Sequence, residues 1–216
     1  TRLLITNGTS IDVRAHRVTG LGRGLGKTGR LNEQGIGRVL DVVTEFKSLI
    51  SENGVQKIRA VATSAARDAA NRDDLFIPVA AALNHEVELL SGDDEARYGF
   101  SGATAGLAPS NGPFLVIDIG GGSTEFSYGT HSAEIYRSVD MGSVRFMEQF
   151  LVNDPPKPEE LSGAIQVARL HLDDIDRNHA IVGKARSLVG VAGTITTIAA
   201  VEIGLEPYDP AIIDGF

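Results

Sequence analysis

The segment FLVIDIGGGSTEF, residues 114–126, combines carboxylates and hydroxyls with three consecutive glycines. Asp118 stands at the end of an apolar run, two residues before the first glycine, and Ser123 and Glu125 follow the glycines. Glycines let backbone N–H groups face outward and form an anion-binding concavity. A carboxylate beside such a turn is a ligand that Mg²⁺ accepts. The pattern therefore favours a phosphate-binding turn with a metal site over a purely structural glycine hairpin.

Two other turns have the composition of anion sites. Gly193 and Thr194 stand where a predicted strand meets a predicted helix, and a helix N-terminus favours phosphate. Thr63 and Ser64 begin another helix, with Arg67 one turn further on. Arginine binds phosphate in a bidentate manner, so this turn fits a phosphate site. A capping hydroxyl with a surface arginine explains the same residues equally well.

A cluster of three acids, Asp93, Asp94 and Glu95, follows Ser91. Asp94 stands three residues after Ser91, as in a capping box. Acids in the first helical turn complement the helix dipole. A carboxylate crowded by like charges can instead have a raised pKa and act as a general base. The sequence leaves both roles open.

The sequence alternates between predicted strands and predicted helices, which indicates an α/β fold. These elements must position the residues named above. Residues 105–113, AGLAPSNGP, form the best linker candidate, so we expect domains at residues 1–108 and 109–216. The apolar patterns predict strands at 3–6, 11–18, 57–62, 86–90, 114–119, 124–128, 134–139 and 188–192. They predict helices at 32–53, 65–84 and 91–104, a long helix around 161–175 and another from 193.

The charge distribution suggests an anionic ligand. Residues 1–72 have twelve Lys and Arg against six Asp and Glu, although the whole chain has a net charge of −8. The overall acidity argues against a general DNA-binding protein. The sequence has no cysteine, no apolar run long enough to span a membrane and no signal-peptide pattern. We expect a cytoplasmic protein that binds neither nucleic acid nor membranes.

Four ordered motifs resemble the exopolyphosphatase/guanosine pentaphosphate phosphohydrolase (Ppx/GppA) family of the actin, sugar-kinase and Hsp70 superfamily. They are AVATSAARDA (60–69), LLSGDDEARYGF (89–100), FLVIDIGGGSTEF (114–126) and GVAGTITTIAA (190–200). The resemblance implies two ribonuclease-H-like domains that flank a cleft, with Mg²⁺ as cofactor. It also implies a homodimer that releases terminal phosphate from polyphosphate or pppGpp.

The resemblance assigns a role to each matching residue. Glu95 corresponds to the general base, and Asp118 and Glu125 correspond to acids near the metal and the attacking water. The residues that correspond to phosphate ligands are Arg67, Gly120, Gly121, Gly122, Ser123, Gly193 and Thr194.

The N-terminal segment departs from the family pattern. The family opens with a first phosphate loop, whereas residues 1–8 of this sequence parallel residues 124–129. We expect that this loop lies upstream of residue 1. We also expect that the second domain is cut short at the C-terminal segment YDPAIIDGF, where the family usually continues with helix. Two other functions stay open at this stage. One is a non-catalytic regulator that binds polyphosphate or a guanosine alarmone, and the other is an ATP-using kinase.

Overall fold

A computed structural model of the chain describes residues 1–207 and 209–213. The chain folds into two compact units, one from Thr1 to Leu90 and one that begins at Ser91. The predicted boundary after residue 108 differs from this division, because the helix after Ser91 packs on the sheet of the second unit. The predicted second domain runs to residue 216, and residues 208 and 214–216 lie outside this description.

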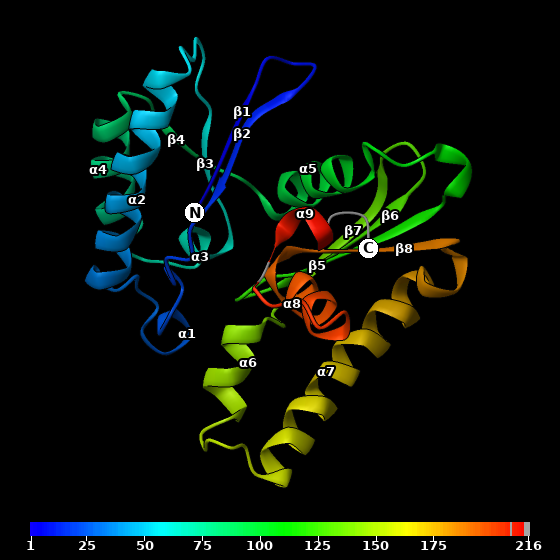
Figure 1. The fold of residues 1–216 in the computed structure, drawn as a ribbon. Helices are drawn as coiled ribbons and strands as arrows, with labels where there is room; N and C mark the ends of the chain where they lie inside the picture. The colour runs from blue at the N-terminus through cyan, green and yellow to red at the C-terminus, as the bar shows by residue number, and fades with distance from the viewer. Residues whose placement is uncertain (208, 214–216) are drawn as a thin grey trace. The chain divides into compact units, whose positions relative to one another are not determined.

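The first unit contains two small sheets and two long helices (Figure 1). Strands β1 and β2 pair antiparallel, and β3 and β4 pair parallel. In chain order the elements are β1 (Arg2–Thr6), β2 (Ile11–His16), α1 (Leu25–Thr28), α2 (Glu33–Glu52), β3 (Ala60–Ala62), α3 (Ser64–Arg67), α4 (Asp73–Leu83) and β4 (Val87–Leu89).

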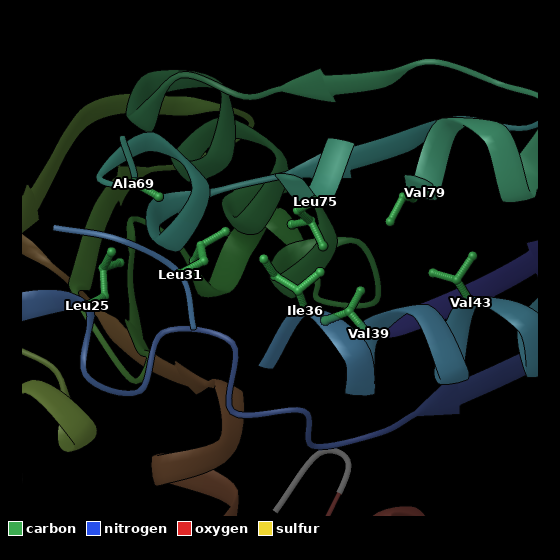
Figure 2. Packing of buried hydrophobic residues seen from close by; sticks show 8 residues of the cluster. All are labelled: Leu25, Leu31, Ile36, Val39, Val43, Ala69, Leu75 and Val79. Carbon is green, nitrogen blue, oxygen red and sulfur yellow. The ribbon is translucent and has the colours of Figure 1, made fainter. Parts of the chain in front are cut away.

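The core of the first unit lies between α2 and α4. Ile36, Val39 and Val43 of α2 face Leu75 and Val79 of α4, as Figure 2 shows. Each of these five side chains is less than 9% exposed, and burial of such a side chain contributes about 1.5–3 kcal/mol. The helix predicted over residues 32–53 is therefore confirmed as α2.

The single helix predicted over residues 65–84 is wrong, because the chain breaks it into α3 and α4. Asn71 lies in the break, and its side chain accepts from the Leu31 N–H at 2.8 Å and donates to the Leu31 carbonyl at 3.1 Å. An asparagine side chain that bonds to backbone competes with helix formation. The break follows from this contact with residues far away in the sequence.

The second unit is built on a four-stranded mixed sheet in the order β7-β6-β5-β8 (Figure 1). Strands β5 (Phe114–Ile119), β6 (Thr124–Gly129) and β7 (Ala133–Val139) pair antiparallel, and β8 (Ser187–Val191) lies parallel to β5. The helices are α5 (Gly92–Thr104), α6 (Ser143–Phe150), α7 (Pro158–His179), α8 (Ala192–Glu202) and α9 (Pro210–Ile213), with short 3-10 turns at Pro109–Asn111 and Val182–Lys184.

The predicted strands of this unit are confirmed, and so is the mixed α/β class. Helix α6 was not predicted. The ribonuclease-H-like character of each unit stays a prediction. None of the helices in the described ranges has the length and apolar character needed to cross a membrane.

The two faces of this sheet differ in chemistry. Leu115 and Phe126 pack with Ile175 of α7 on one face. Side chains alternate along a strand, so Val116 and Asp118 of β5 lie on the other face. There Phe100 of α5, which is fully buried, packs against Val116. The acidic residues of β5 and β6 therefore belong to the face that packs against α5.

Candidate active site

Three carboxylates from different elements line one small pocket in the second unit. Asp118 near the end of β5 pairs directly with Glu125 on β6, and Glu95 comes from the first turn of α5. Ala96, Gly99, Phe100, Val116 and Ser127 complete the lining. The space open to the centre of a water molecule is about 10 Å³, which is room for about one water. The predicted acids therefore come together.

Glu125 is the buried member of this group, with 6% of its surface exposed. Burial raises the pKa of the Glu125 carboxyl above its ordinary value, and the nearby charges of Glu95 and Asp118 raise it further. The hydroxyls of Ser123 and Ser138 act in the opposite direction, because they hydrogen-bond the charged form. A site that holds three acids this close is suited to a proton acceptor or to a cation.

The first turn of α5 separates the roles of its acids. Ser91 Oγ accepts from the Asp94 N–H at 3.1 Å and donates to Asp94 Oδ2 at 2.7 Å, which confirms the predicted capping interaction. Asp93 accepts a hydrogen bond of 3.1 Å from the Tyr136 hydroxyl, a partner that the sequence did not reveal. Of the three acids, Glu95 is the one that lines the pocket.

The glycine turn is held by the N-terminus of α6. Ser143 N donates to the Gly120 carbonyl at 3.0 Å, and Val144 N donates to the Gly121 carbonyl at 2.9 Å. Arg145 Nε donates to the Gly122 carbonyl at 2.6 Å. Within residues 1–207 and 209–213, the N–H groups of Gly121 and Gly122 make no hydrogen bond. These two donors are available to an anion, and the phosphate role of the glycine turn stays a prediction.

Gly142 is a site residue that sequence reasoning missed. A Cβ at this position would lie 2.4 Å from the Gly121 carbonyl oxygen and 2.6 Å from the Gly122 carbonyl carbon. Its backbone is extended, with φ of −142°, so the need for glycine is steric. A glycine before an amphipathic segment was the available signal, but nothing in the sequence linked it to residues 120–122.

We expect Gly142→Ala to reduce activity at least tenfold and to destabilise the protein by about 1–3 kcal/mol, because backbone atoms of the glycine turn must move. Phosphate release and thermal unfolding measure the two effects. Gly102→Ala in α5 is the matched control, since a Cβ there meets no atom within 4 Å. Wild-type activity in Gly142→Ala would show that the turn has no fixed geometry.

Gly193 and Thr194 lie at the same edge of the sheet as the glycine turn. Strand β8 runs parallel to β5, and Val191 pairs with Asp118 just before α8 begins. Thr196 and Thr197 donate to the Gly193 carbonyl at 3.2 and 2.7 Å, so this carbonyl is already engaged. A Cβ at Gly193 would meet nothing within 4 Å. The phosphate role of these two residues stays a prediction.

Arg67 belongs to the first unit, where it ends α3. Its Nη1 donates to the Leu90 carbonyl at 3.0 Å, and Arg67 is half-buried. This bond holds the guanidinium group of Arg67 against the backbone of Leu90, the residue that precedes Ser91. The contact of Arg67 with phosphate stays a prediction.

The donor set at the pocket fits the predicted magnesium ion. Among the described residues, no group of three or more His, Asp or Glu side chains could hold a metal ion. Magnesium usually takes one or two carboxylates and completes its shell with water and substrate phosphate. Asp118 and Glu125, paired across two strands, would supply those carboxylates, and a cation would relieve the repulsion among the three acids.

Comparison with known proteins gives consistent results. The Ppx/GppA phosphatase family matches residues 6–207. Exopolyphosphatase 2 of Mycobacterium tuberculosis (strain ATCC 25618 / H37Rv) is 38% identical over 205 residues, which are 93% of this chain and 64% of that protein. The guanosine-5'-triphosphate,3'-diphosphate pyrophosphatase of Aeromonas salmonicida is 30% identical over 186 residues, 86% of this chain and 37% of that protein.

The solved structures agree with the sequence relatives. The crystal structure of an exopolyphosphatase-like protein superposes with a TM-score of 0.91 at 36% identity and covers 98% of this chain and 68% of that one. The chain spans 64% of the length of the first of these curated relatives and 37% of the second. Because the family match covers residues 6–207, almost the whole of this chain, the chain belongs to the Ppx/GppA phosphatase family.

Proposed function

We propose that the protein hydrolyses the terminal phosphoanhydride bond of linear inorganic polyphosphate, with pppGpp as a second substrate. The observation that supports this most directly is the pocket lined by Glu95, Asp118 and Glu125 next to the glycine turn. Relatives named as an exopolyphosphatase and as a guanosine-5'-triphosphate,3'-diphosphate pyrophosphatase support this substrate class.

The chain's own residues account for the chemistry in the following way. The N–H groups of Gly121 and Gly122 bind oxygens of the terminal phosphate. Glu95 accepts a proton from a water molecule as the water oxygen attacks the terminal phosphorus. The bond from phosphorus to the bridging oxygen breaks, which leaves orthophosphate and a chain shorter by one phosphate. Such a reaction needs alignment and charge stabilisation more than covalent help from the protein.

Magnesium would be held by Asp118 and Glu125, and when bound it would neutralise charge on the phosphate oxygens. Both carboxylates lie on the sheet face that packs against α5. Asp118 is only partly buried, which is compatible with the approach of an ion to this residue.

Asp118→Asn tests this assignment. We expect at least a tenfold loss of activity at saturating Mg²⁺, and a higher Mg²⁺ concentration for half-maximal activity, because asparagine lacks the negative charge. Titration of phosphate release with Mg²⁺ measures both effects. Asp173→Asn, an exposed position on α7, is the control that should behave as wild type. Wild-type Mg²⁺ dependence in Asp118→Asn would exclude Asp118 from the metal site.

The deciding experiment measures phosphate release by the full-length protein from polyphosphate, pppGpp and ATP in parallel. The proposal expects turnover of polyphosphate, and a smaller or comparable rate with pppGpp. Tight binding of these anions without release would indicate the regulatory binder, and preferred use of ATP would indicate a kinase. Sizing chromatography of the same sample tests the predicted homodimer. The cytoplasmic location stays a prediction.

A further inference from the structure

Strand β7 contributes no residue to the pocket lining, yet two of its side chains donate hydrogen bonds to carboxylates on β6 and α5. Ser138 pairs directly with Glu125, which in turn pairs with Asp118. These three side chains therefore stand in one row across β5, β6 and β7 on the same face of the sheet. Ser138 Oγ donates to Glu125 Oε1 at 2.8 Å.

Glu125 needs such a donor for a physical reason. It is 6% exposed, so water cannot freely solvate its carboxylate. Glu95 and Asp118 repel it, and this repulsion favours rotation of the Glu125 side chain away from the pocket. A hydroxyl that holds one carboxylate oxygen opposes this rotation. Ser123, in the glycine turn, is the other hydroxyl that acts on Glu125.

Tyr136 stands two residues before Ser138 on the same face. It pairs with Ser127 across the strands, and its hydroxyl donates to Asp93 Oδ2 at 3.1 Å. Ser127 Oγ donates to the Ala96 carbonyl at 3.3 Å. These two bonds attach α5 to the sheet at Asp93 and at Ala96, which precede and follow Glu95 in the sequence.

We propose that Ser138 and Tyr136 make β7 a positioning strand, in which Ser138 orients Glu125 and Tyr136 fixes the turn that bears Glu95. The inference rests on the proposed function, because it requires Glu95 and Glu125 to act in the reaction. Neither residue touches the substrate in this proposal. Ser138 is itself exposed, so its replacement by alanine removes the hydroxyl without opening a cavity in the core.

The test compares steady-state kinetics of the full-length protein with polyphosphate. We expect Ser138→Ala to lower kcat about 10- to 100-fold, as loss of a hydrogen bond to a charged group would, with KM within about twofold of wild type. Ser138→Thr, which restores a hydroxyl on a strand, should recover kcat to within about threefold. Tyr136→Phe should lower kcat about three- to tenfold, since its bond is exposed.

A matched control lies in the same sheet. Ser187 Oγ also donates a hydrogen bond of 2.8 Å, to the Asn111 carbonyl, and it pairs with Phe114 at the opposite end of β5 from Asp118. Ser187→Ala should keep the kcat of the wild type. It separates a positioning effect from a general loss of a hydrogen bond in this sheet.

A double-mutant cycle isolates the coupling. With Glu125 already replaced by glutamine, Ser138→Ala should cause less than about a threefold further loss. Provided that the wild-type protein releases phosphate, three results would overturn the inference alone. They are full additivity in the cycle, a wild-type kcat in Ser138→Ala, and no recovery of kcat in Ser138→Thr. A wild-type protein that releases no phosphate would overturn the proposed function and this inference with it.

Discussion

Glu95→Gln is expected to lower phosphate release from polyphosphate about 100- to 10,000-fold, which is the usual effect of removing a general base. Glutamine keeps the size of the side chain but cannot accept the proton from water. Binding of polyphosphate should be retained or tightened, because one negative charge that faces the polyanion is gone. Turnover and equilibrium binding, measured on the same preparation, check both halves of this expectation.

Asp94→Asn is the control for Glu95→Gln, one residue away. Asp94 interacts with Ser91 and Arg97 and does not line the pocket. Its replacement should cost less than about fivefold in turnover, with a small loss of stability from the weakened cap. Similar losses in both variants, or full turnover in Glu95→Gln, would contradict the assignment of Glu95 as the base.

Glu125→Gln is expected to lower activity at least 100-fold and, at the same time, to raise the melting temperature at neutral pH. The pKa of Glu125 is raised in the folded protein by burial and by the neighbouring carboxylates. The folded state therefore holds this proton more tightly than the unfolded state does. Ionisation of the Glu125 carboxyl therefore destabilises the folded state relative to the unfolded state. This loss of stability grows as the pH rises from the ordinary glutamate pKa to the raised pKa of the folded protein, and it stays constant at higher pH.

The stability difference should accordingly depend on pH. Glu125→Gln and wild type, unfolded in the presence of a chelator, should differ most above neutral pH and converge as the pH falls below the ordinary glutamate pKa. Glu134→Gln, exposed on β7, is the control and should leave the profile unchanged. A Glu125→Gln protein that is less stable than wild type at pH 8 would show that the charged carboxylate is well solvated.

The strand pattern and the acids at strand ends were accessible from sequence because they depend on local order. Phe114–Ile119 is an apolar run, and the residues after the glycines alternate. Pairing of two strands joined by a short turn then places Asp118 opposite Glu125.

Other parts of the site depend on contacts between distant residues, which one sequence does not encode in a readable pattern. Gly142 is required because the glycine turn lies against it. Tyr136 and Ser138 look like ordinary strand residues until their register with β6 is known. The division after Leu90 differs from the predicted boundary for the same reason, since the linker-like composition of residues 105–113 says nothing about which sheet α5 packs against.

The glycines of this chain are under two separate kinds of constraint. At Gly142 even a methyl group collides with backbone, so folding itself demands glycine there. At Gly193 the surrounding space is open and the protein would accommodate a side chain. Selection that preserves Gly193 would therefore point to the phosphate ligand that we propose for the start of α8. A mutational scan scored once for folding and once for activity would separate the two glycines. Substitutions of Gly142 should impair folding, whereas substitutions of Gly193 should leave folding intact and impair activity.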